Sequence, residues 1–134
     1  MGGDGDVHDP RQPKTSQPDI PAMLSFQKMD VYRRAVDFGA LSVAIIGATP
    51  RGHAGLRDQL RRAAFSISLN IAEGAGRMSD ADAARHYGIA RGSAMECAAV
   101  LDHLQALGVV QDDKYRRGIE LLERLVAMLT KLCR

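Results

Sequence analysis

Apolar residues recur every three or four positions along most of the chain, which is the period of an amphipathic helix. No segment alternates apolar and polar residues in the way of a half-buried strand. The pattern predicts four helices, over about residues 29–46, 56–72, 79–107 and from residue 112 to the end of the printed sequence. Because the connections between them are short, we expect an all-α fold, an antiparallel up-down four-helix bundle.

The first residues differ from the rest in composition. Residues 1–24 contain four of the five prolines and three glycines, with few apolar side chains to bury. We predict a disordered Gly/Pro-rich tail over residues 1–24 and a single four-helix-bundle domain over residues 25–134.

Residues that favour helix ends stand at the predicted boundaries. Ser79 is a suitable N-cap, because two aspartates follow it in the first turn, where acids interact favourably with the helix dipole. Gly108 stands where the third helix needs a C-terminal glycine. The second helix is predicted to stop at the glycines of the EGAGR stretch, Gly74 and Gly76.

The second helix has two apolar faces. Its core stripe fits an arc of about 100° and consists of Leu56, Leu60, Ala63, Ala64, Ile67 and Ile71. Phe65, Leu69 and Ala72 fall together on the opposite side. Contiguous apolar surface usually marks an interface, so we predict that these three residues contact another subunit of a homo-oligomer. The alternative is a monomer in which a long loop covers this face.

Two glycines inside the third helix need a physical reason. Gly88 and Gly92 stand one turn apart in a segment rich in small residues. Each costs about 1 kcal/mol relative to alanine in a helix interior. Close approach of a neighbouring helix or of a polar side chain would offset that cost.

Charge and cysteine content narrow the functional classes. The formal net charge is +2, yet residues 28–134 carry 16 basic against 12 acidic groups, which permits an anionic partner without requiring one. Cys97 and Cys133 lack metal-ligand spacing, and no Glu-x-x-His motif of a diiron or dimanganese bundle occurs, so we expect no metal and no cofactor. No apolar run reaches the roughly 20 residues that cross a bilayer, and no signal peptide is evident. We therefore expect a cytoplasmic protein without a membrane partner.

Glu73 and Glu96 are the obvious candidates for catalysis. Two carboxylates act as an acid and base pair when they lie about 5 to 10 Å apart, and the glycines of EGAGR resemble a phosphate-binding loop. This loop, however, follows a helix instead of a strand and lacks the Lys-Ser or Lys-Thr of a P-loop, so a helix–helix turn is the better interpretation. We predict no catalytic site.

Polar residues that interrupt the apolar pattern favour a structural network. Asn70 lies beside the core stripe of the second helix, and Glu73 follows one turn later. Ser93 and Glu96 repeat this spacing in the third helix. We predict hydrogen bonds between the two helices, with arginines as partners for the carboxylates. The predicted network consists of Ser66, Asn70, Glu73, Arg91, Ser93 and Glu96.

The arginines allow two interpretations. They form a solvated face that pairs with nearby acids, or they are repeated around the axis of an oligomer and form a belt that attracts nucleic-acid phosphates. The candidate nucleic-acid-binding residues are Arg57, Arg61, Arg62, Arg77, Arg33 and Arg34.

Three stretches resemble a known family. VYRRA in the first helix, LRDQLRRAAFSISLNIAEGAGR in the second, and HYGIARGSAMEC in the third resemble the four-helix-bundle proteins of ribosomal RNA intervening sequences. That family is related to the accessory variability determinant of diversity-generating retroelements. The resemblance covers about residues 25–134. The signature residues are Arg61, Arg62, Ser66, Asn70, Glu73, Gly74, Arg77, Gly92, Ser93 and Glu96.

The resemblance implies a ring-shaped homopentamer in the bacterial cytoplasm. For the retroelement branch, it also implies a non-catalytic adaptor that binds a reverse transcriptase and RNA through basic surface. We therefore predict a non-enzymatic, homo-oligomeric adaptor that binds RNA or DNA, a nucleic-acid enzyme such as a reverse transcriptase, or both. The alternative is a purely structural protein–protein assembly module without nucleic-acid binding.

Overall fold

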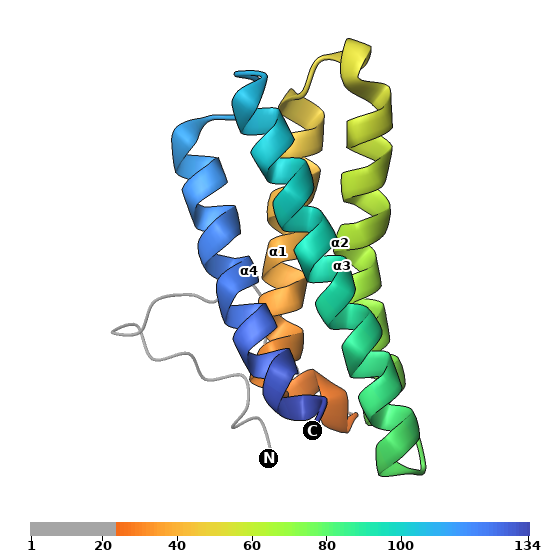
Figure 1. The fold of residues 1–134 in the computed structure, drawn as a ribbon. Coiled ribbons are helices and arrows are strands. Elements are labelled where there is room, and N and C mark those ends of the chain that lie inside the picture. The colour runs from red at the N-terminus through yellow and green to blue at the C-terminus, as the bar shows by residue number, and fades with distance from the viewer. Residues whose placement is uncertain (1–23) are drawn as a thin grey trace, which may run out of the picture.

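The computed structural model of the chain describes residues 24–134 (Figure 1). The predicted disordered tail over residues 1–24 therefore lies outside the described residues, apart from Leu24. In the described part, two short 3-10 helices and four α-helices follow one another without a strand. The elements are η2 (Ser25–Lys28), α1 (Asp30–Ala48), η3 (Arg51–His53), α2 (Ala54–Ala75), α3 (Asp80–Ala106) and α4 (Asp112–Leu132).

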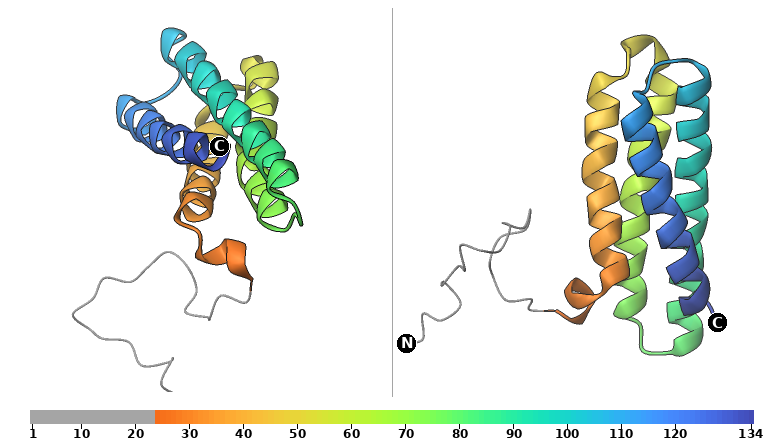
Figure 2. Two further views of the ribbon diagram at one scale, coloured as in Figure 1. Left: turned by 60° about the horizontal axis from the view of Figure 1, so that its bottom comes forward. Right: turned by 90° about the vertical axis from the view of Figure 1, so that its left-hand side faces the viewer.

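The four α-helices run alternately up and down (Figure 1). Each packs against two neighbours, in the order α1, α2, α3, α4 and back to α1, and Figure 2 shows this arrangement from two further directions. The contact between α2 and α3 is the most extensive, and the contact between α1 and α4 is the least extensive. The predicted all-α class with four helices is confirmed. The turns between the helices are short, and short turns make successive helices run antiparallel.

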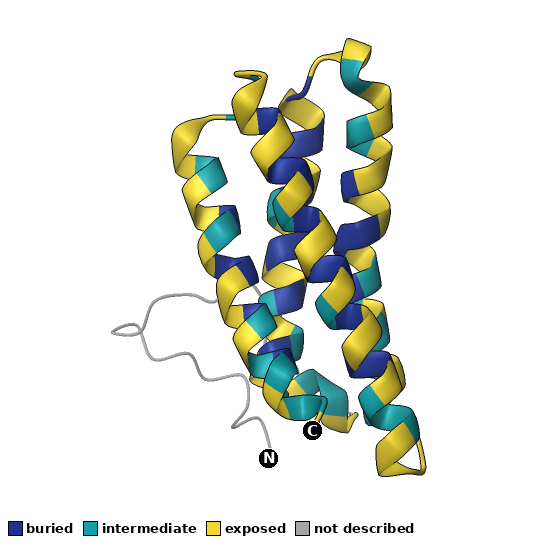
Figure 3. Ribbon diagram, in the orientation of Figure 1, coloured by how far each residue is buried: buried dark blue, intermediate teal, exposed yellow. Residues whose placement is uncertain are grey.

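The hydrophobic core lies between the four helices. Buried positions form stripes on the sides of the ribbons that face the other helices (Figure 3). Of the six predicted core residues of α2, five are buried and Leu56 is half-buried. Burial of one large apolar side chain contributes about 1.5 to 3 kcal/mol. Every helix contributes such side chains, namely Phe38, Ile45, Leu60, Ile67, Ile71, Leu101, Leu104, Leu125 and Leu129.

Two of the expected capping residues act as predicted. The Ser79 hydroxyl accepts a hydrogen bond from the backbone N–H of Asp82 at 3.1 Å, so it caps the first turn of α3. After α3, Gly108 adopts a left-handed φ of 71°, and its N–H donates to the carbonyl of Gln105 at 2.9 Å. The N–H of Val109 donates to the carbonyl of Leu104 at 3.1 Å, which completes a Schellman motif.

Of the two glycines at which α2 was predicted to stop, Gly76 is its C-cap, whereas Gly74 does not end the helix, which continues to Ala75. Gly74 is buried inside the last turn, where α2 crosses α3. A Cβ at this position would lie 2.8 Å from Cε1 of Tyr87 and 3.1 Å from the backbone oxygen of Ala83. Gly74 therefore permits a close approach between the helices, and it does not break α2.

Candidate functional site

A chain of hydrogen bonds joins α2 to α3, and we call it the polar seam. The hydroxyl of Ser93 donates to the hydroxyl oxygen of Ser66 at 2.8 Å. The amide nitrogen of Asn70 donates to the Ser66 carbonyl at 2.9 Å and to the Ser66 hydroxyl oxygen at 3.0 Å. On its other side, Oδ1 of Asn70 lies 3.2 Å from Nδ1 of His86. Three residues of the predicted network therefore lie in one continuous chain.

His86 belongs to the polar seam although the sequence analysis did not select it. Its side chain is buried, and its Nε2 lies 3.0 Å from Nη2 of Arg85. Because a guanidinium only donates hydrogen bonds, Nε2 of His86 must be the acceptor. The ring proton is therefore on Nδ1, which donates a hydrogen bond to Oδ1 of Asn70. The spacing held a usable signal, since His86 precedes Ser93 by seven positions and so occupies the same face of α3.

Glu73, Arg91 and Glu96, the other expected members of the network, make their contacts elsewhere. Glu73 is exposed and pairs at 2.7 Å with Arg77 of the α2–α3 turn. Glu96 is exposed and accepts a hydrogen bond from Gln59 at 3.0 Å. The list is completed by Arg91, whose Nε donates to the Thr130 hydroxyl at 2.8 Å and so links α3 to α4. The physical reason is desolvation, because a long charged side chain at the rim of a seam keeps its charge in water.

Glu73 and Glu96 do not share a site. Gln59, which binds Glu96, precedes Glu73 by 14 positions on α2, so the two carboxylates lie about 20 Å apart along the helix axis. Within residues 24–134, no group of three or more His, Cys, Asp or Glu side chains is arranged to hold a metal ion. The same part of the chain contains no helix that is long and apolar enough to span a bilayer.

The six arginines proposed for nucleic-acid binding occupy two ends of the bundle. Arg57, Arg61 and Arg62 lie early in α2, whereas Arg33 and Arg34 lie early in α1. Since α1 and α2 are antiparallel, these two groups lie at opposite ends of the bundle (Figure 1). Arg77 belongs to the α2–α3 turn, which lies at the same end of the bundle as the start of α1. One chain alone therefore does not gather them into one surface.

Half of these six arginines pair with carboxylates on the surface. Arg34 lies 3.2 Å from Asp30, and Arg61 lies 3.0 Å from Asp58. Arg77 pairs with Glu73 and, at 3.6 Å, with Asp82. Exposed pairs of this kind contribute about 0 to 1 kcal/mol each, so they leave the guanidinium groups available to a stronger anionic partner.

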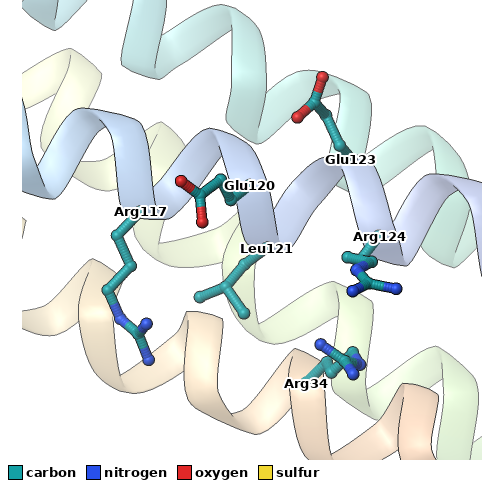
Figure 4. Close-up of a pocket in the computed structure, with 6 residues that line it drawn as sticks. All are labelled: Arg34, Arg117, Glu120, Leu121, Glu123 and Arg124. Carbon is teal, nitrogen blue, oxygen red and sulfur yellow. The ribbon is translucent and has the colours of Figure 1, made fainter.

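A groove between α1 and α4 contains basic residues that the sequence analysis missed. It has a volume of about 360 Å³. Its lining residues are Arg34 from α1 and Arg117, Glu120, Leu121, Glu123 and Arg124 from α4 (Figure 4). The seven-residue spacing between Arg117 and Arg124 places both on one face of α4 and is the signal that could have found them.

An exposed apolar patch lies along α1 and α2, and we call it the α1–α2 patch. Phe65 and Leu69 of α2 are 42% and 66% exposed, and no loop of residues 24–134 covers them. A Cβ on Gly39 would lie 3.7 Å from the Phe65 ring, which places this ring against α1. Val36 and Val43, both exposed, flank Gly39 by one turn on either side. Ala72 of α2, the third expected interface residue, is half-buried at the edge of the patch.

The outward face of α3 consists mostly of small residues, with the exposed side chain of Met95 among them. Gly88 and Gly92 are exposed, and a Cβ on either glycine would meet nothing within 4 Å. The neighbour expected to approach these glycines closely is therefore not another part of residues 24–134. On the wheel of α3, Ala81 and Ala99 lie on the same face and are also exposed.

The cysteines do not form a reactive site. Burial, with a smaller effect from the Glu96 carboxylate, raises the pKa of the Cys97 thiol to about 12. A thiol held in its protonated form is a weak nucleophile and a poor metal ligand. Cys133 is half-buried near the end of α4 and is also a free thiol.

Comparison with known proteins places this helical bundle in a family. The family model for the 23S rRNA-intervening sequence protein matches residues 27–131. The chain therefore belongs to the 23S rRNA-intervening sequence protein family, and the resemblance noted from its motifs is confirmed. A search of curated proteins finds no match.

A solved structure has the same fold. It is a protein of unknown function from the S23 ribosomal protein family of Bacteroides thetaiotaomicron VPI-5482. It is 20% identical to this chain, and the alignment covers 78% of this chain and 98% of that chain with a TM-score of 0.70. At this identity, the similarity shows the shared four-helix fold alone.

Proposed function

We propose that the protein is a non-catalytic, homo-oligomeric adaptor that binds nucleic acid, or a nucleic-acid enzyme such as a reverse transcriptase, through basic surface. The observation that carries the proposal is the α1–α2 patch, where four large apolar side chains remain exposed in the described residues. Contiguous exposed apolar surface of this kind usually marks a protein interface. The separation of Glu73 from Glu96 supports the non-catalytic part, because the two candidate carboxylates reach no common substrate.

The geometry favours assembly into a closed ring. The α1–α2 patch projects aromatic and aliphatic side chains, whereas the outward face of α3 consists mostly of small residues around Met95. These two surfaces differ in shape and lie on different helices, so a contact between them is heterologous. Heterologous contacts close into rings when the rotation per subunit permits, and we propose the homopentamer that the resemblance implies.

The nucleic-acid part rests on charge and on family membership. Residues 28–134 carry more basic than acidic groups, and the family is named for an intervening sequence of 23S rRNA. In a ring, the basic groups at both ends of each bundle are repeated around the axis. Repetition would convert two modest clusters per chain into a continuous belt of the type that binds phosphates.

Light scattering tests the assembly directly. We expect the wild type to have a mass several times the 14.5 kDa of one chain. The double substitution Phe65→Asp with Leu69→Asp places charges in the α1–α2 patch and should reduce the mass to that of one chain. Met78→Asp is the matched control, because Met78 is fully exposed in the α2–α3 turn, outside the patch. A monomeric wild type would contradict the proposed assembly.

A labelled structured RNA tests the nucleic-acid part. We expect a gel shift that weakens with salt and with the double substitution Arg57→Glu and Arg61→Glu. No shift at low salt would show that this part of the proposal is wrong.

The purely structural assembly module remains the second candidate, because one chain does not gather the six selected arginines into one surface. Pull-down from nuclease-treated lysate separates the two functions. Partners that survive the nuclease favour the structural module, and partners that are lost favour the nucleic-acid adaptor.

A further inference from the structure

We propose that the groove between α1 and α4 binds consecutive phosphates of a single nucleic-acid strand, with Arg34, Arg117 and Arg124 as the ligands. The inference rests on the proposed nucleic-acid binding and assigns it to a place in the fold. None of the arginines first selected from the sequence, except Arg34, lies in this groove. The site is therefore distinct from the arginine clusters of α2.

The three guanidinium groups reach the groove from two helices. Figure 4 shows the side chains of Arg117 and Arg124 directed from α4 toward α1, and the side chain of Arg34 directed from α1 toward α4. The Arg34 and Arg124 groups face one another across the groove, whereas the carboxylate of Glu123 points away from α1. The groove thus has guanidinium groups on both of its walls, and the Glu120 carboxylate lies between Arg117 and Leu121 (Figure 4).

The carboxylates of the protein do not neutralise all three guanidinium groups. Among the described residues, no carboxylate lies within ion-pairing distance of Arg117 or Arg124, although Glu120 and Glu123 lie on the same helix. Arg34 uses its Nε for Asp30, which leaves its two terminal amino groups toward the groove. Three guanidinium groups along one groove repel one another, and an anion between them would turn that repulsion into attraction.

The packing of α4 explains why the groove exists. Gly118 brings α4 close to the bundle, because a Cβ there would lie 2.8 Å from Cδ1 of Leu101 and 3.7 Å from atoms of Leu41 and Phe38. The contact between α1 and α4 is nevertheless the least extensive in the bundle, so space remains above the core. Leu121, which is 8% exposed, forms the apolar floor of that space.

The shape and lining of the groove favour a nucleic-acid backbone over other anions. Arg117 and Arg124 are two helical turns apart, about 10 Å along the axis, so their guanidinium groups can contact separate phosphates of one strand. The lining contains no aromatic ring on which a base could stack, so the groove contacts phosphates and carries no base readout. An acidic peptide needs an apolar anchor for affinity, and the lining offers only the nearly buried Leu121.

Fluorescence anisotropy with labelled 12-nucleotide oligo(U) RNA and oligo(dT) DNA tests the site. We expect Arg117→Gln with Arg124→Gln to weaken binding at least tenfold and to reduce the slope of log K against log salt by about 1.4, the value for two lost single-strand phosphate contacts. The matched control is Arg51→Gln with Arg116→Gln, which removes the same charge from exposed positions outside the groove and should weaken binding less than threefold. Equal losses in the two double variants would overturn the proposal, because binding would then follow net charge.

A second measurement separates failure of this site from failure of the proposed function. The unfolding temperature is recorded with inorganic tripolyphosphate at constant ionic strength, and the wild type and the control should gain stability while the groove variant does not. No difference between the groove variant and the control would overturn the phosphate site. If tripolyphosphate stabilises the protein through the groove but neither oligonucleotide binds, the groove does not bind nucleic acid, and the proposal is overturned. If poly-glutamate binds more tightly than the oligonucleotides, the groove belongs to an acidic protein.

Discussion

The polar seam between α2 and α3 and the groove between α1 and α4 lie on opposite sides of the bundle, and their polar groups differ in whether they have partners. In the polar seam between α2 and α3, Ser66, Asn70, His86 and Ser93 are joined to one another in a continuous chain of hydrogen bonds. In the groove between α1 and α4, the guanidinium groups of Arg117 and Arg124 have no carboxylate partner in the described residues.

The difference indicates that the polar seam is structural and that the groove is open to a ligand. A buried hydrogen-bonded chain fixes the register of two helices, and its groups are costly to leave unpaired. Exposed charges without partners contribute little to folding, so they are available for binding. Substitutions in the polar seam should therefore change the stability of the fold, and substitutions in the groove should change affinity.

The largest loss of stability is expected from Gly74→Ala. The new methyl group would lie 2.8 Å from the Tyr87 ring and 3.1 Å from the Ala83 backbone, so α2 and α3 must move apart. Overpacking of this kind costs about 1 to 3 kcal/mol. Urea unfolding measures the cost, and Gly55→Ala, where a Cβ meets nothing within 4 Å, is the control that should not lose stability. Equal stability of the two variants would show that the seam is not closely packed.

Asn70→Ala should have the next largest effect. It removes the acceptor of the His86 N–H and both hydrogen bonds to Ser66. An unsatisfied buried donor costs about 1 to 3 kcal/mol. Arg124→Gln in the groove should change the free energy of unfolding by less than about 0.5 kcal/mol. Similar losses of stability in Asn70→Ala and Arg124→Gln would remove the distinction between the polar seam and the groove.

Gly92→Ala should separate the stability of the chain from that of the assembly. Within one chain the added methyl group meets open space, and helix propensity should raise stability by about 0.8 to 1 kcal/mol. If the outward face of α3 contacts a second subunit, the same methyl group should weaken the oligomer. Chemical unfolding and light scattering, at several concentrations of protein, measure the two effects. An oligomer of unchanged strength would exclude Gly92 from the interface.

The effect of Cys97→Ala on stability should depend on pH. Because burial raises the pKa of Cys97 from 9.0 to about 12, the folded state retains a proton that the unfolded state releases. The thiol's contribution is therefore fully present below pH 9 and is lost as pH rises from 9 to 12. The wild type should lose stability more steeply than Cys97→Ala across that window, and unfolding curves at each pH measure this difference. Parallel curves would show that Cys97 ionises as readily in the folded state.

Much of the fold could be predicted from the spacing of apolar residues. The stripe from Leu60 to Ile71 identified the buried face of α2, and Ser79 and Gly108 identified the ends of α3. Gly74 was misinterpreted because a glycine near a helix end has two uses, and only the position of Tyr87 shows which one applies.

The sites were harder to predict because they depend on contacts between helices. Asn70 was selected by its position beside the apolar stripe and Ser93 by its spacing from Glu96, but the same reasoning included Glu73 and Glu96, whose long side chains reach solvent. The groove between α1 and α4 was missed because Arg117 and Arg124 look like an ordinary charged face until α1 is placed opposite them.

The central claim is that assembly strengthens nucleic-acid binding by repeating the basic surface of each chain, and RNA affinity in an assembly-deficient variant tests it most directly. Phe65→Ser with Leu69→Ser disrupts the α1–α2 patch without changing charge or any arginine. Once light scattering establishes that this variant is monomeric, its affinity for labelled RNA should be at least tenfold weaker, since multivalent contacts are lost. An affinity equal to that of the assembled wild type would contradict the account.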